Sequence, residues 1–479
     1  MSSEDAETAK TICPYCGVGC GIQVRQGDDP GDVRFMPWSD APVNEGSICI
    51  KGGAATEVVD HEDRLTEPLI EEDGEFREAT WEEAYDRIVS ELTRIREEYG
   101  PDAMGFFGSS KTMNEENYLL QKIARRYGTN NVDNCTRMCH ASTVWALRTS
   151  LGAGAMTNSM ADLEEAADVF WIQGANPGEQ HPIANSQYFR QAVLEGATVI
   201  QVDPHANKTT RSFDVQGTDR HMHLQVNPGA DIPLLNVVLK TILERHEEDP
   251  EAGWIDEAFV EERTEGFEHL KETLEGFDRG AAAEEAGVPL EDIELAAEKY
   301  AMANNAAIFT GMGMSQHTCG VDNVQNEINL ALITGNVGKP GTGVNPLRGQ
   351  NNVQGTSDVL PGYQLVDDDE ARRSVEDVWG FEVPDEPGLT NVELSHEFGD
   401  SVHGLYVMGE NPVMSEPDSN EVEKRLNSLE FVVAQDIFMT ETAEFADVVL
   451  PATTWAERGG TVTNTDRRVQ RMRGVDKVH

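Results

Sequence analysis

The chain has 479 residues, of which 86 are Asp or Glu and 37 are Lys or Arg, so its formal charge is −49. Binding to nucleic acid or to an anionic membrane surface depends on clustered Lys and Arg, so this charge argues against both. Hydrophobic residues make up 39% of the chain, which argues against disorder. At roughly 150 residues per domain, the length allows about three domains.

The acidic residues are spread along the whole chain and form no single acidic tail. This distribution predicts a halophilic protein, because a high salt concentration screens the self-repulsion of such a surface. An ordinary acidic protein is the alternative. The N-terminus has no basic and apolar leader, and no window approaches about 18 consecutive apolar residues, so we expect a cytoplasmic protein without membrane insertion.

The predicted elements begin after a Gly- and Cys-rich segment at residues 11–66. A capping box of Thr80 and Glu83 starts a helix that ends at Gly100, and a strand at 104–107 and a helix at 115–127 follow. Further strands are expected at 169–173, 198–202, 307–310, 405–408, 431–434 and 448–450, and further helices at 183–194, 232–244, 290–302, 321–333 and 420–426. The acidic stretch 366–390 is expected to be a loop or an insertion. The alternation of strands and helices predicts an α/β fold with mostly parallel sheets covered on both faces.

Four of the seven cysteines lie near the N-terminus in a C-x2-C-x3-C-x28-C pattern. They are Cys13, Cys16, Cys20 and Cys49. Four thiolates on a glycine-rich backbone suit a 4Fe–4S cluster, in which each iron takes one Cys. A structural zinc site is the first alternative, although it usually shows paired C-x2-C knuckles. Cysteines of the protein core without a ligand are the second.

This motif resembles the N-terminal domain of the molybdopterin oxidoreductases, which carry Mo or W on two molybdopterin guanine dinucleotides. Combined with the charge, the resemblance points to a haloarchaeal member. It implies that Lys51, two residues after the fourth cysteine, lies between the cluster and the pterin and couples the two redox centres. Without the resemblance, Lys51 would be interpreted as a solvated surface residue.

A second motif is the Cys139-His140 pair at the end of the segment 130–140. From the residue types alone, Cys139 could be a nucleophile, a metal ligand or a small buried side chain. The segment resembles the formate dehydrogenases, which implies that Cys139 is the ligand of Mo or W and that His140 accepts a proton. The pKa of a histidine suits such a task. Cys135 and Cys319 are expected to be core or supporting residues.

Several predicted strands end in Gly, Asn or Asp without forming a G-x-G-x-x-G fingerprint. Ligands of open α/β sheets lie at the carboxyl ends of the strands, and glycines let a pyrophosphate approach the backbone amides. For each segment taken alone, an ordinary turn is the alternative. Together the segments resemble the dinucleotide-binding loops of the family, and 345–355 is especially similar to formate dehydrogenases. The implied cofactor-binding residues are Gly174, Asn176, Glu179, Asp203, Gly229, Asp231, Gly311, Gly313, Gln316, Gly349, Gln350, Asn351, Gly409, Asn411, Asp436 and Arg467.

The sequence departs from the family pattern at two places. Some formate dehydrogenases have an Arg that would bind the formate carboxylate, and the matching position here is Gln325, a neutral donor. The chain also stops at His479, where family members continue into a C-terminal β-barrel domain, so we expect that domain to be absent. A split gene, a truncation or a short paralogue would each account for this.

The resemblance implies three domains. The iron–sulfur domain covers residues 1–67 and is joined by 455–479. One doubly wound αβα domain is discontinuous, with residues 68–134 and 328–454, and the other covers residues 135–327.

The function implied by the resemblance is oxidation of formate to carbon dioxide at a Mo- or W-pterin centre, with electrons leaving through the 4Fe–4S cluster. Because no nicotinamide or flavin site is evident, a separate electron-acceptor protein or subunit is expected, and a further chain could supply the missing domain. One alternative is reduction of nitrate or another oxyanion on the same scaffold. The other is an iron–sulfur electron-transfer protein without catalytic activity.

Overall fold

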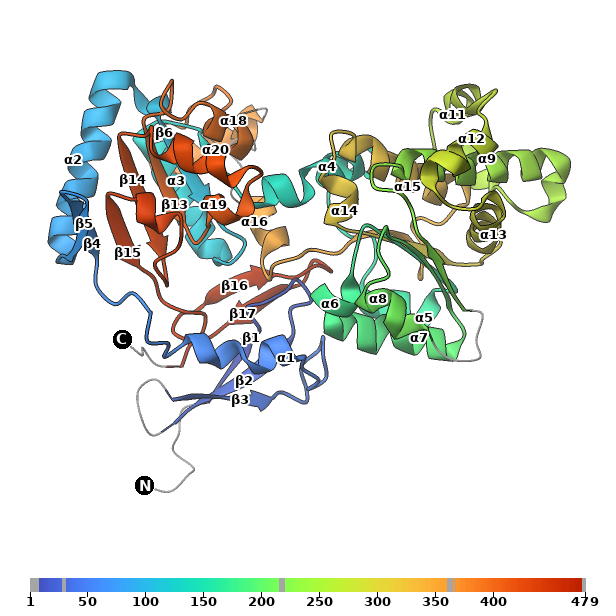
Figure 1. Ribbon diagram of the computed structural model, residues 1–479, viewed down its shortest axis with the longest axis horizontal. Coiled ribbons are helices and arrows are strands. Elements are labelled where there is room, and N and C mark those ends of the chain that lie inside the picture. The colour runs from blue at the N-terminus through green and yellow to red at the C-terminus, as the bar shows by residue number, and fades with distance from the viewer. Residues whose placement is uncertain (1–7, 28–31, 215–219, 360–364, 367, 476–479) are drawn as a thin grey trace. The chain divides into compact units, whose positions relative to one another are not determined.

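The computed structural model describes residues 8–27, 32–214, 220–359, 365–366 and 368–475 (Figure 1). The chain forms two compact units. The first unit consists of Met1–Met138, Gln350–Asn464 and Arg468–His479, and the second of Cys139–Gly349 and Thr465–Arg467. Within the described ranges, no helix has the length and apolar character needed to span a bilayer.

The first unit contains a small antiparallel sheet in the order β1-β2-β3. Its strands are β1 (Thr8–Ile12), β2 (Gly21–Gln26) and β3 (Val33–Pro37). The hairpin of β16 (Gly460–Thr463) and β17 (Val469–Met472) lies beside this sheet (Figure 1). The amide of Arg473 donates to Oγ1 of Thr11 at 3.2 Å, which ties the end of the chain to β1.

The larger sheet of the first unit has seven strands in the order β5-β4-β15-β14-β13-β6-β7. Five are parallel, and the hairpin β4-β5 joins β15 in the antiparallel sense. The strands are β4 (Leu69–Glu72), β5 (Glu75–Glu78), β6 (Met104–Gly108), β7 (Val132–Asn134), β13 (Gly404–Met408), β14 (Phe431–Asp436) and β15 (Val448–Pro451).

Helices cover both faces of this sheet. On β6, Phe106 packs in a core with α2 and α3, while its neighbour Phe107 packs with α18 and α20. This alternation is what a strand buried on both faces requires. The helices are α1 (Ile50–Gly53), α2 (Trp81–Tyr99), α3 (Asn114–Tyr127), α16 (Val353–Val359), α17 (Asp369–Trp379), α18 (Asn391–His396), α19 (Pro412–Ser415) and α20 (Ser419–Leu426).

The second unit is built on a parallel sheet of five strands in the order β10-β9-β8-β11-β12. Its strands are β8 (Val169–Gln173), β9 (Thr198–Val202), β10 (His221–Leu224), β11 (Ala306–Thr310) and β12 (Gly343–Pro346). Trp171 joins the large core under α9, α13 and α15, while Phe170 packs on the other face against Phe189 and Phe309.

The helices of the second unit surround this sheet. They are α4 (Thr136–Leu151, whose first turn belongs to the first unit), α5 (Met160–Ala166), α6 (Pro177–Gln180), α7 (Arg190–Glu195), α8 (Lys208–Phe213), α9 (Asp231–Glu248), α10 (Glu257–Arg263), α11 (Phe267–Leu274), α12 (Arg279–Ala286), α13 (Leu290–Ala301), α14 (Met312–Ser315) and α15 (Gly320–Ile333). A π-helical turn at Ala184–Phe189 precedes α7.

The predicted α/β class with mostly parallel sheets is confirmed. The predicted loop at 366–390 is wrong in part, because α17 occupies Asp369–Trp379. Asp368 caps this helix by accepting from the amides of Glu370 and Ala371, and Gly380 ends it in the left-handed conformation. These are ordinary helix boundaries that the acidic composition concealed.

Candidate functional site

The cysteine motif forms a tight loop between β1 and β2. The amide of Cys13 donates to the carbonyl of Cys20 at 2.9 Å, and the amide of Gly19 donates to that of Cys16 at 3.3 Å. Gly19 has a φ of 72°, and a Cβ there would collide with the side chain of Gln470, so only glycine suits this turn. The loop therefore closes on itself and brings its cysteines together.

The four predicted cluster cysteines lie close enough for the charge on one to shift the pKa of another. The pKa of Cys13 is raised to about 12, chiefly by burial and in part by the charges of Cys16 and Cys49. Burial also raises the pKa of Cys20, and the other three cysteines add to this effect. Thiols whose pKa values are raised in this way become thiolates only beside a cationic group, which a 4Fe–4S cluster would supply.

The glycine after Cys49 fits the same interpretation. A Cβ at Gly52 would collide with the side chain of Ile48 and would lie 3.3 Å from Sγ of Cys13, so a glycine is needed where the backbone packs beside this sulfur. In the part of the chain that the structure describes, no three His, Cys, Asp or Glu side chains are grouped so that they could hold a single metal ion.

Two lysines lie next to this loop. Burial raises the pKa of Cys16, and the charge of Lys51, on α1, acts against this rise, which places Lys51 near that cysteine. The second is Lys111, which the sequence analysis missed. Its Nζ donates to the carbonyls of Pro14 and Tyr15 at 2.8 Å each and lies 5.6 Å from the centre of the Tyr15 ring. Lys111 therefore holds the backbone between the first two cysteines.

A cavity of about 550 Å³ adjoins the cysteine loop within the first unit. It lies at the carboxyl ends of β13, β14 and β15, where ligands of parallel sheets bind. Three predicted cofactor residues, Asn351, Gly409 and Asp436, line this cavity together with Lys111. Its remaining lining residues are Pro14, Tyr15, Ala55, Val58, Trp81, Thr112, Glu116, Met408, Gln435, Ile437, Pro451, Ala452, Thr453, Thr454, Trp455, Arg458 and Met472.

Two other predicted cofactor residues of the first unit have partners of their own. Gln350 pairs with Cys16 in an isolated antiparallel bridge, and its Oε1 lies 3.6 Å from Sγ of Cys135. Asn411 lies after β13, where it donates to Glu441 at 2.7 Å and accepts from the hydroxyl of Thr442 at 2.7 Å. Gln350 therefore touches the cysteine loop, while Asn411 braces the turn after β13.

The Cys139-His140 pair opens the second unit on α4. Cys139 is 8% exposed and His140 is fully buried. Burial raises the pKa of Cys139 to about 11, while the charge of Arg348 and a hydrogen bond from the amide of Gly349 lower it. A Cβ added at Gly349 would meet no atom within 4 Å, so there is open space beside this thiol.

Arg348 is a second residue that the sequence analysis did not place. It is 1% exposed, and its charge acts on both Cys139 and His140. Its amide donates to Oγ1 of Thr465 at 3.0 Å, and its carbonyl lies 2.6 Å from Nε2 of His181. Hydrogen bonds therefore hold the backbone of Arg348 in place, and its positive charge acts on Cys139 and His140, the predicted catalytic pair.

The environment of His140 favours the neutral imidazole. Burial holds its pKa well below the usual value, and the charges of Arg348 and His181 lower it further, against a smaller opposing effect of the Leu347 backbone. A neutral imidazole has a nitrogen lone pair that can accept a proton.

The glycine loops of the five-stranded sheet meet at its carboxyl edge. The amide of Gly313 donates to the carbonyl of Gly174 at 2.9 Å. A Cβ at Gly311 or Gly313 would come within 3 Å of Gly174, so close contact between the loops after β8 and β11 explains these glycines without a ligand. Sequence alone could not separate the two reasons.

The polar residues at this edge have protein partners. Asn176 accepts from Oγ1 of Thr209 at 2.8 Å, and Glu179 pairs with Lys208 at 2.9 Å. Asp203 accepts from the amide of His205 at 2.8 Å. These contacts brace the loops after β8 and β9.

The other predicted residues of this unit lie at or near the same edge. Asp231 begins α9 and accepts from Nε2 of Gln173 at 2.9 Å, and its pKa is raised by burial. Gly229 has a φ of 85° and open space at its Cβ position. Gln316 is exposed at the end of α14, and Arg467 is exposed with a φ of 67°.

The structure does not bring Gln325 to the predicted catalytic pair. Its Oε1 accepts from Oγ of Ser150 at 2.7 Å, and its Nε2 donates to Asn329 at 3.2 Å. Ser150 lies eleven residues after Cys139 on α4, which is roughly 16 Å along a helix. Gln325 therefore braces the far end of α4 against α15.

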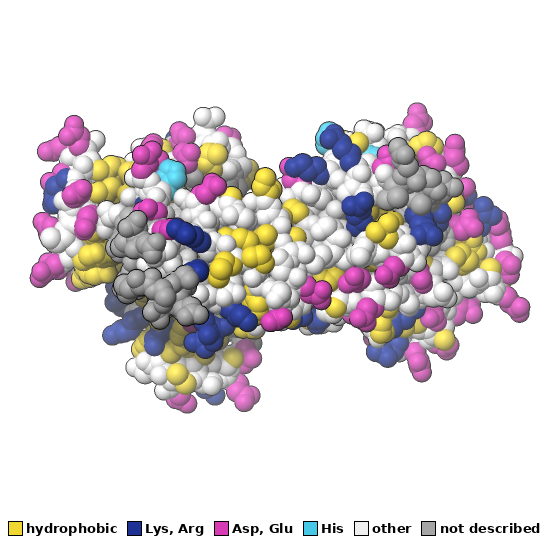
Figure 2. All heavy atoms as spheres, turned by 90° about the horizontal axis from the view of Figure 1, so that it is seen from below, with side chains coloured by type: hydrophobic (Ala, Val, Ile, Leu, Met, Phe, Trp, Pro, Cys, Tyr) yellow, Lys and Arg dark blue, Asp and Glu magenta, His cyan; other side chains and the backbone are white. Residues whose placement is uncertain are grey.

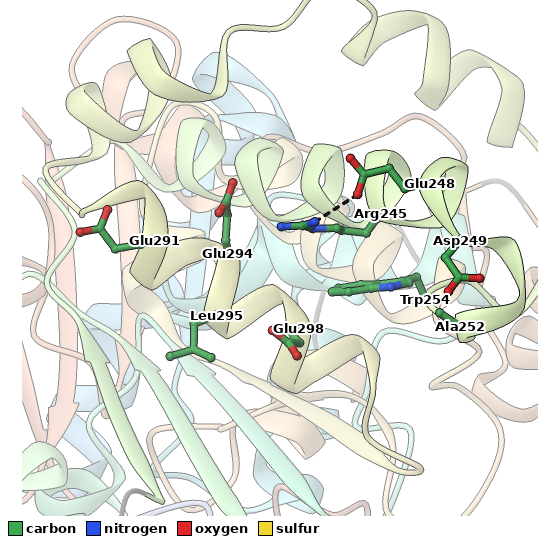
Figure 3. Close-up of a pocket in the computed structure, with 9 residues that line it drawn as sticks. All are labelled: Arg245, Glu248, Asp249, Ala252, Trp254, Glu291, Glu294, Leu295 and Glu298. Carbon is green, nitrogen blue, oxygen red and sulfur yellow. Dashed lines mark hydrogen bonds and ion pairs between the residues drawn. The ribbon is translucent and has the colours of Figure 1, made fainter.

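A separate cavity of about 470 Å³ in the second unit carries none of the predicted residues (Figure 3). Glu291, Glu294 and Glu298 line it from α13, opposite Arg245, whose Nη1 lies 3.0 Å from Glu248. This excess of carboxylates would repel a small anion. It is therefore a poor site for formate.

Comparison with known proteins extends these observations. Residues 6–61 match the Fe4S4 domain of molybdopterin oxidoreductases, and residues 64–477 match the molybdopterin oxidoreductase family. The chain is 46% identical, over 97% of its length, to the F420-dependent formate dehydrogenase 2 subunit alpha of Methanococcus maripaludis, and 39% identical, over 96% of its length, to formate dehydrogenase H of Escherichia coli. It spans 66% and 64% of those two proteins.

The fold is shared with a more distant enzyme. Acetylene hydratase from Pelobacter acetylenicus matches 98% of this chain with a TM-score of 0.78 at 21% sequence identity, and the match spans 66% of that enzyme. The family match covers both units and includes all four cluster cysteines, Cys139 and Arg348. The chain is therefore a member of the molybdopterin oxidoreductase family, with its Fe4S4 domain at the N-terminus.

Proposed function

We propose that this chain is the catalytic part of a formate dehydrogenase. The observation that carries the proposal is its 44–46% identity, over 96–97% of its length, to the alpha subunits of three F420-dependent formate dehydrogenases of methanogens. The reaction converts formate into carbon dioxide, one proton and two electrons. The division into an iron–sulfur domain (1–67 with 455–479) and two αβα domains (68–134 with 328–454, and 135–327) is part of this proposal.

The cysteines and the loops described above are of the kinds that would bind the cofactors of the family. Cys13, Cys16, Cys20 and Cys49 would hold the 4Fe–4S cluster, and Cys139 would provide a thiolate to Mo or W, with the sheet-edge loops holding the two guanine dinucleotides. When bound, the metal centre supplies a two-electron acceptor that passes electrons singly to the cluster. The hydrogen bond from Gly349 and the charge of Arg348 stabilise the thiolate form of Cys139 that a metal requires.

Arg348 would bind the carboxylate of formate. A buried guanidinium next to Cys139 and His140 attracts and orients a small anion by charge-assisted hydrogen bonds. This gives the site the positive charge that Gln325 lacks. Gln325, which braces α4 from a distance, would act on the reaction only by keeping that helix in place.

His140 would accept the proton as the C–H bond of formate breaks. Its burial keeps the imidazole neutral and therefore ready to receive a proton, and it excludes water from the pair. The electrons would leave through the cluster, with Lys51 and Lys111 stabilising the added negative charge. A separate electron-acceptor protein would then reoxidise the cluster.

Metal analysis together with two activity assays tests this proposal. We expect about four iron and one Mo or W per chain, formate-dependent reduction of a dye, and no nitrate-dependent oxidation of reduced viologen. The variant Cys139→Ala should lose formate turnover while keeping its iron, whereas Cys319→Ala should keep both. Iron without Mo or W in the parent protein would refute the enzyme and favour an electron-transfer protein, and nitrate reduction without formate oxidation would favour the oxyanion reductase.

A further inference from the structure

Two segments of this acidic chain contain no acidic residue at all. Residues 8–27 include Lys10 and Arg25, and residues 467–475 include four arginines, with no Asp or Glu in either segment. In the chain as a whole, acidic residues outnumber basic ones by 86 to 37. Both segments belong to the proposed iron–sulfur region, which carries acidic residues elsewhere, so these two segments are its basic parts.

The fold places these two segments side by side. The amide of Arg473 donates to Thr11, which brings β17 next to β1. The side chains of β1 and β17 alternate between buried and exposed positions, and Lys10 and Arg471 are on the exposed side. Arg25 pairs in register with Thr8, so it shares the exposed face of the small sheet with Lys10. We call Lys10, Arg25, Arg471 and Arg473 the basic patch.

Figure 2 shows Lys and Arg side chains on the lobe that contains the small sheet and a second group of them at the upper right, with Asp and Glu side chains scattered over the rest of the visible surface. Lys10 keeps its Nζ at 4.7 Å from the centre of the Trp38 ring, which holds this side chain over the sheet. Arg471 and Arg473 are exposed. These two arginines are therefore accessible to a partner, on a chain whose net charge is −49.

The inward side of β17 contacts the cysteine loop. Gln470 lies between two outward-facing residues of β17, and its own side chain points inward. Its Nε2 donates to the carbonyl of Gly19 at 2.7 Å. Asn464, just before β17, donates to the carbonyl of Val18 at 3.1 Å. Since Val18 and Gly19 lie between Cys16 and Cys20, a single strand separates the exposed arginine Arg471 from the loop that holds the cluster.

We propose that the basic patch is the docking surface for an acidic electron-carrier protein that takes electrons from the cluster. This inference rests on the proposed function, which requires such an acceptor. A positive patch on a negatively charged protein attracts an acidic partner there and repels it elsewhere, so it raises the association rate in the one orientation that suits electron transfer. One electron passes from the reduced cluster to the oxidised carrier, so the cluster is oxidised and the carrier reduced.

The test uses an acidic plant-type [2Fe–2S] ferredoxin as the probe. The full chain, with its cluster reduced by dithionite and the excess removed, is mixed with oxidised ferredoxin in a stopped-flow instrument at several salt concentrations. The variant Arg471→Glu/Arg473→Glu is compared with Arg373→Glu/Lys424→Glu, which makes the same change in charge on α17 and α20. Iron content and the EPR spectrum of the reduced cluster are recorded for each protein.

We expect the patch variant to lower the second-order rate constant at low salt at least tenfold, and to flatten the salt dependence seen for the parent protein. The control variant should stay within about twofold of the parent. Equal effects of the two variants, with the cluster intact in both, would overturn the docking surface, as would patch-dependent binding of duplex DNA with no effect on ferredoxin. A parent protein without cluster iron would instead refute the proposed function.

Discussion

A buried ion pair behind the cavity of the first unit allows a quantitative prediction. Nη1 of Arg64 lies 3.0 Å from Oε2 of Glu457, and the two side chains are only 3% and 1% exposed. The guanidinium also donates to the carbonyls of Val59 and Ala452 at 2.7 and 3.2 Å. Glu457 additionally accepts from the amide and the hydroxyl of Thr454 at 2.7 Å each. The pair thus anchors the cavity wall that includes Thr454, Trp455 and Arg458.

The variant Arg64→Met removes the positive charge and keeps an apolar side chain of similar length. It leaves the carboxylate of Glu457 buried without its counter-charge, and breaking such a pair costs about 3–5 kcal/mol. Domains of about 150–250 residues lose about 2–4 °C in Tm per kcal/mol, so the unfolding transition of the first unit should fall by about 6–20 °C. Differential scanning calorimetry measures this shift, and hydrogen exchange of peptides covering 452–458 should show local opening.

The matched control is Arg87→Met, which removes an exposed ion pair. Nη1 of Arg87 lies 3.4 Å from Glu91 on the same helix, and the arginine side chain is 48% exposed. Such pairs contribute about 0.3–0.5 kcal/mol, so the shift should be about 1–2 °C. The double variant Arg64→Met/Glu457→Gln should recover part of the lost stability, because no buried charge remains. If Arg64→Met shifted the transition no more than Arg87→Met, the assignment of Arg64 as an anchor would be wrong.

Three further predictions concern the site and its surroundings. Lys111→Met removes a positive charge next to the cysteine loop, so the reduction potential of the cluster should become more negative in an EPR-monitored redox titration. Lys111→Arg keeps the charge and should stay close to the parent protein. An unchanged potential in Lys111→Met would contradict this reasoning. Arg348→Met should weaken formate binding strongly while Arg148→Met, exposed on α4, should not, as judged by KM for formate. Burial raises the pKa of Glu416 to about 7, so the folded state disfavours its ionisation. Stability should therefore fall as pH rises from about 4.3, where an unfolded Glu ionises, to about 7, and Glu416→Gln should flatten this part of a urea-unfolding profile. A slope unchanged by that substitution would show that other groups cause it.

Local signals in the sequence predicted much of the fold. The capping box of Thr80 and Glu83 is present in the structure, and α2 runs from Trp81 to Tyr99 as its apolar spacing indicates. The strands β8 and β9 occupy the predicted residues. Runs of mostly apolar residues are typical of strands in a sheet that helices cover on both faces, because both sides of such a strand are buried. The helix α17 was missed because the acidic composition of its segment suggested a loop, although its cap at Asp368 and a helical spacing of its apolar residues are present in the sequence.

The candidate site was predicted less completely than the fold. The C-x2-C-x3-C spacing sufficed to predict the cysteine loop, because three of its cysteines are close together in the chain. Arg348 was visible as a charged residue in a family segment, but nothing local indicates that its charge acts on Cys139. The glycines Gly174 and Gly313 were interpreted as cofactor residues, whereas contact between two neighbouring strand loops is enough to require them.

The sequence by itself therefore determined the α/β class, the cysteine loop and the family, because each depends on periodicity or spacing within a short stretch of chain. Only the tertiary structure decided which charged residues lie next to the cysteines. It places Lys111 on the backbone between Cys13 and Cys16, and it places Arg348 beside Cys139, which lies 209 residues earlier in the chain. It also brings β1, with Lys10, and β17, with Arg471, next to the cysteine loop. Electrostatic contacts between residues distant in sequence depend on how the strands are ordered in the sheets, and that order leaves no local pattern in the sequence.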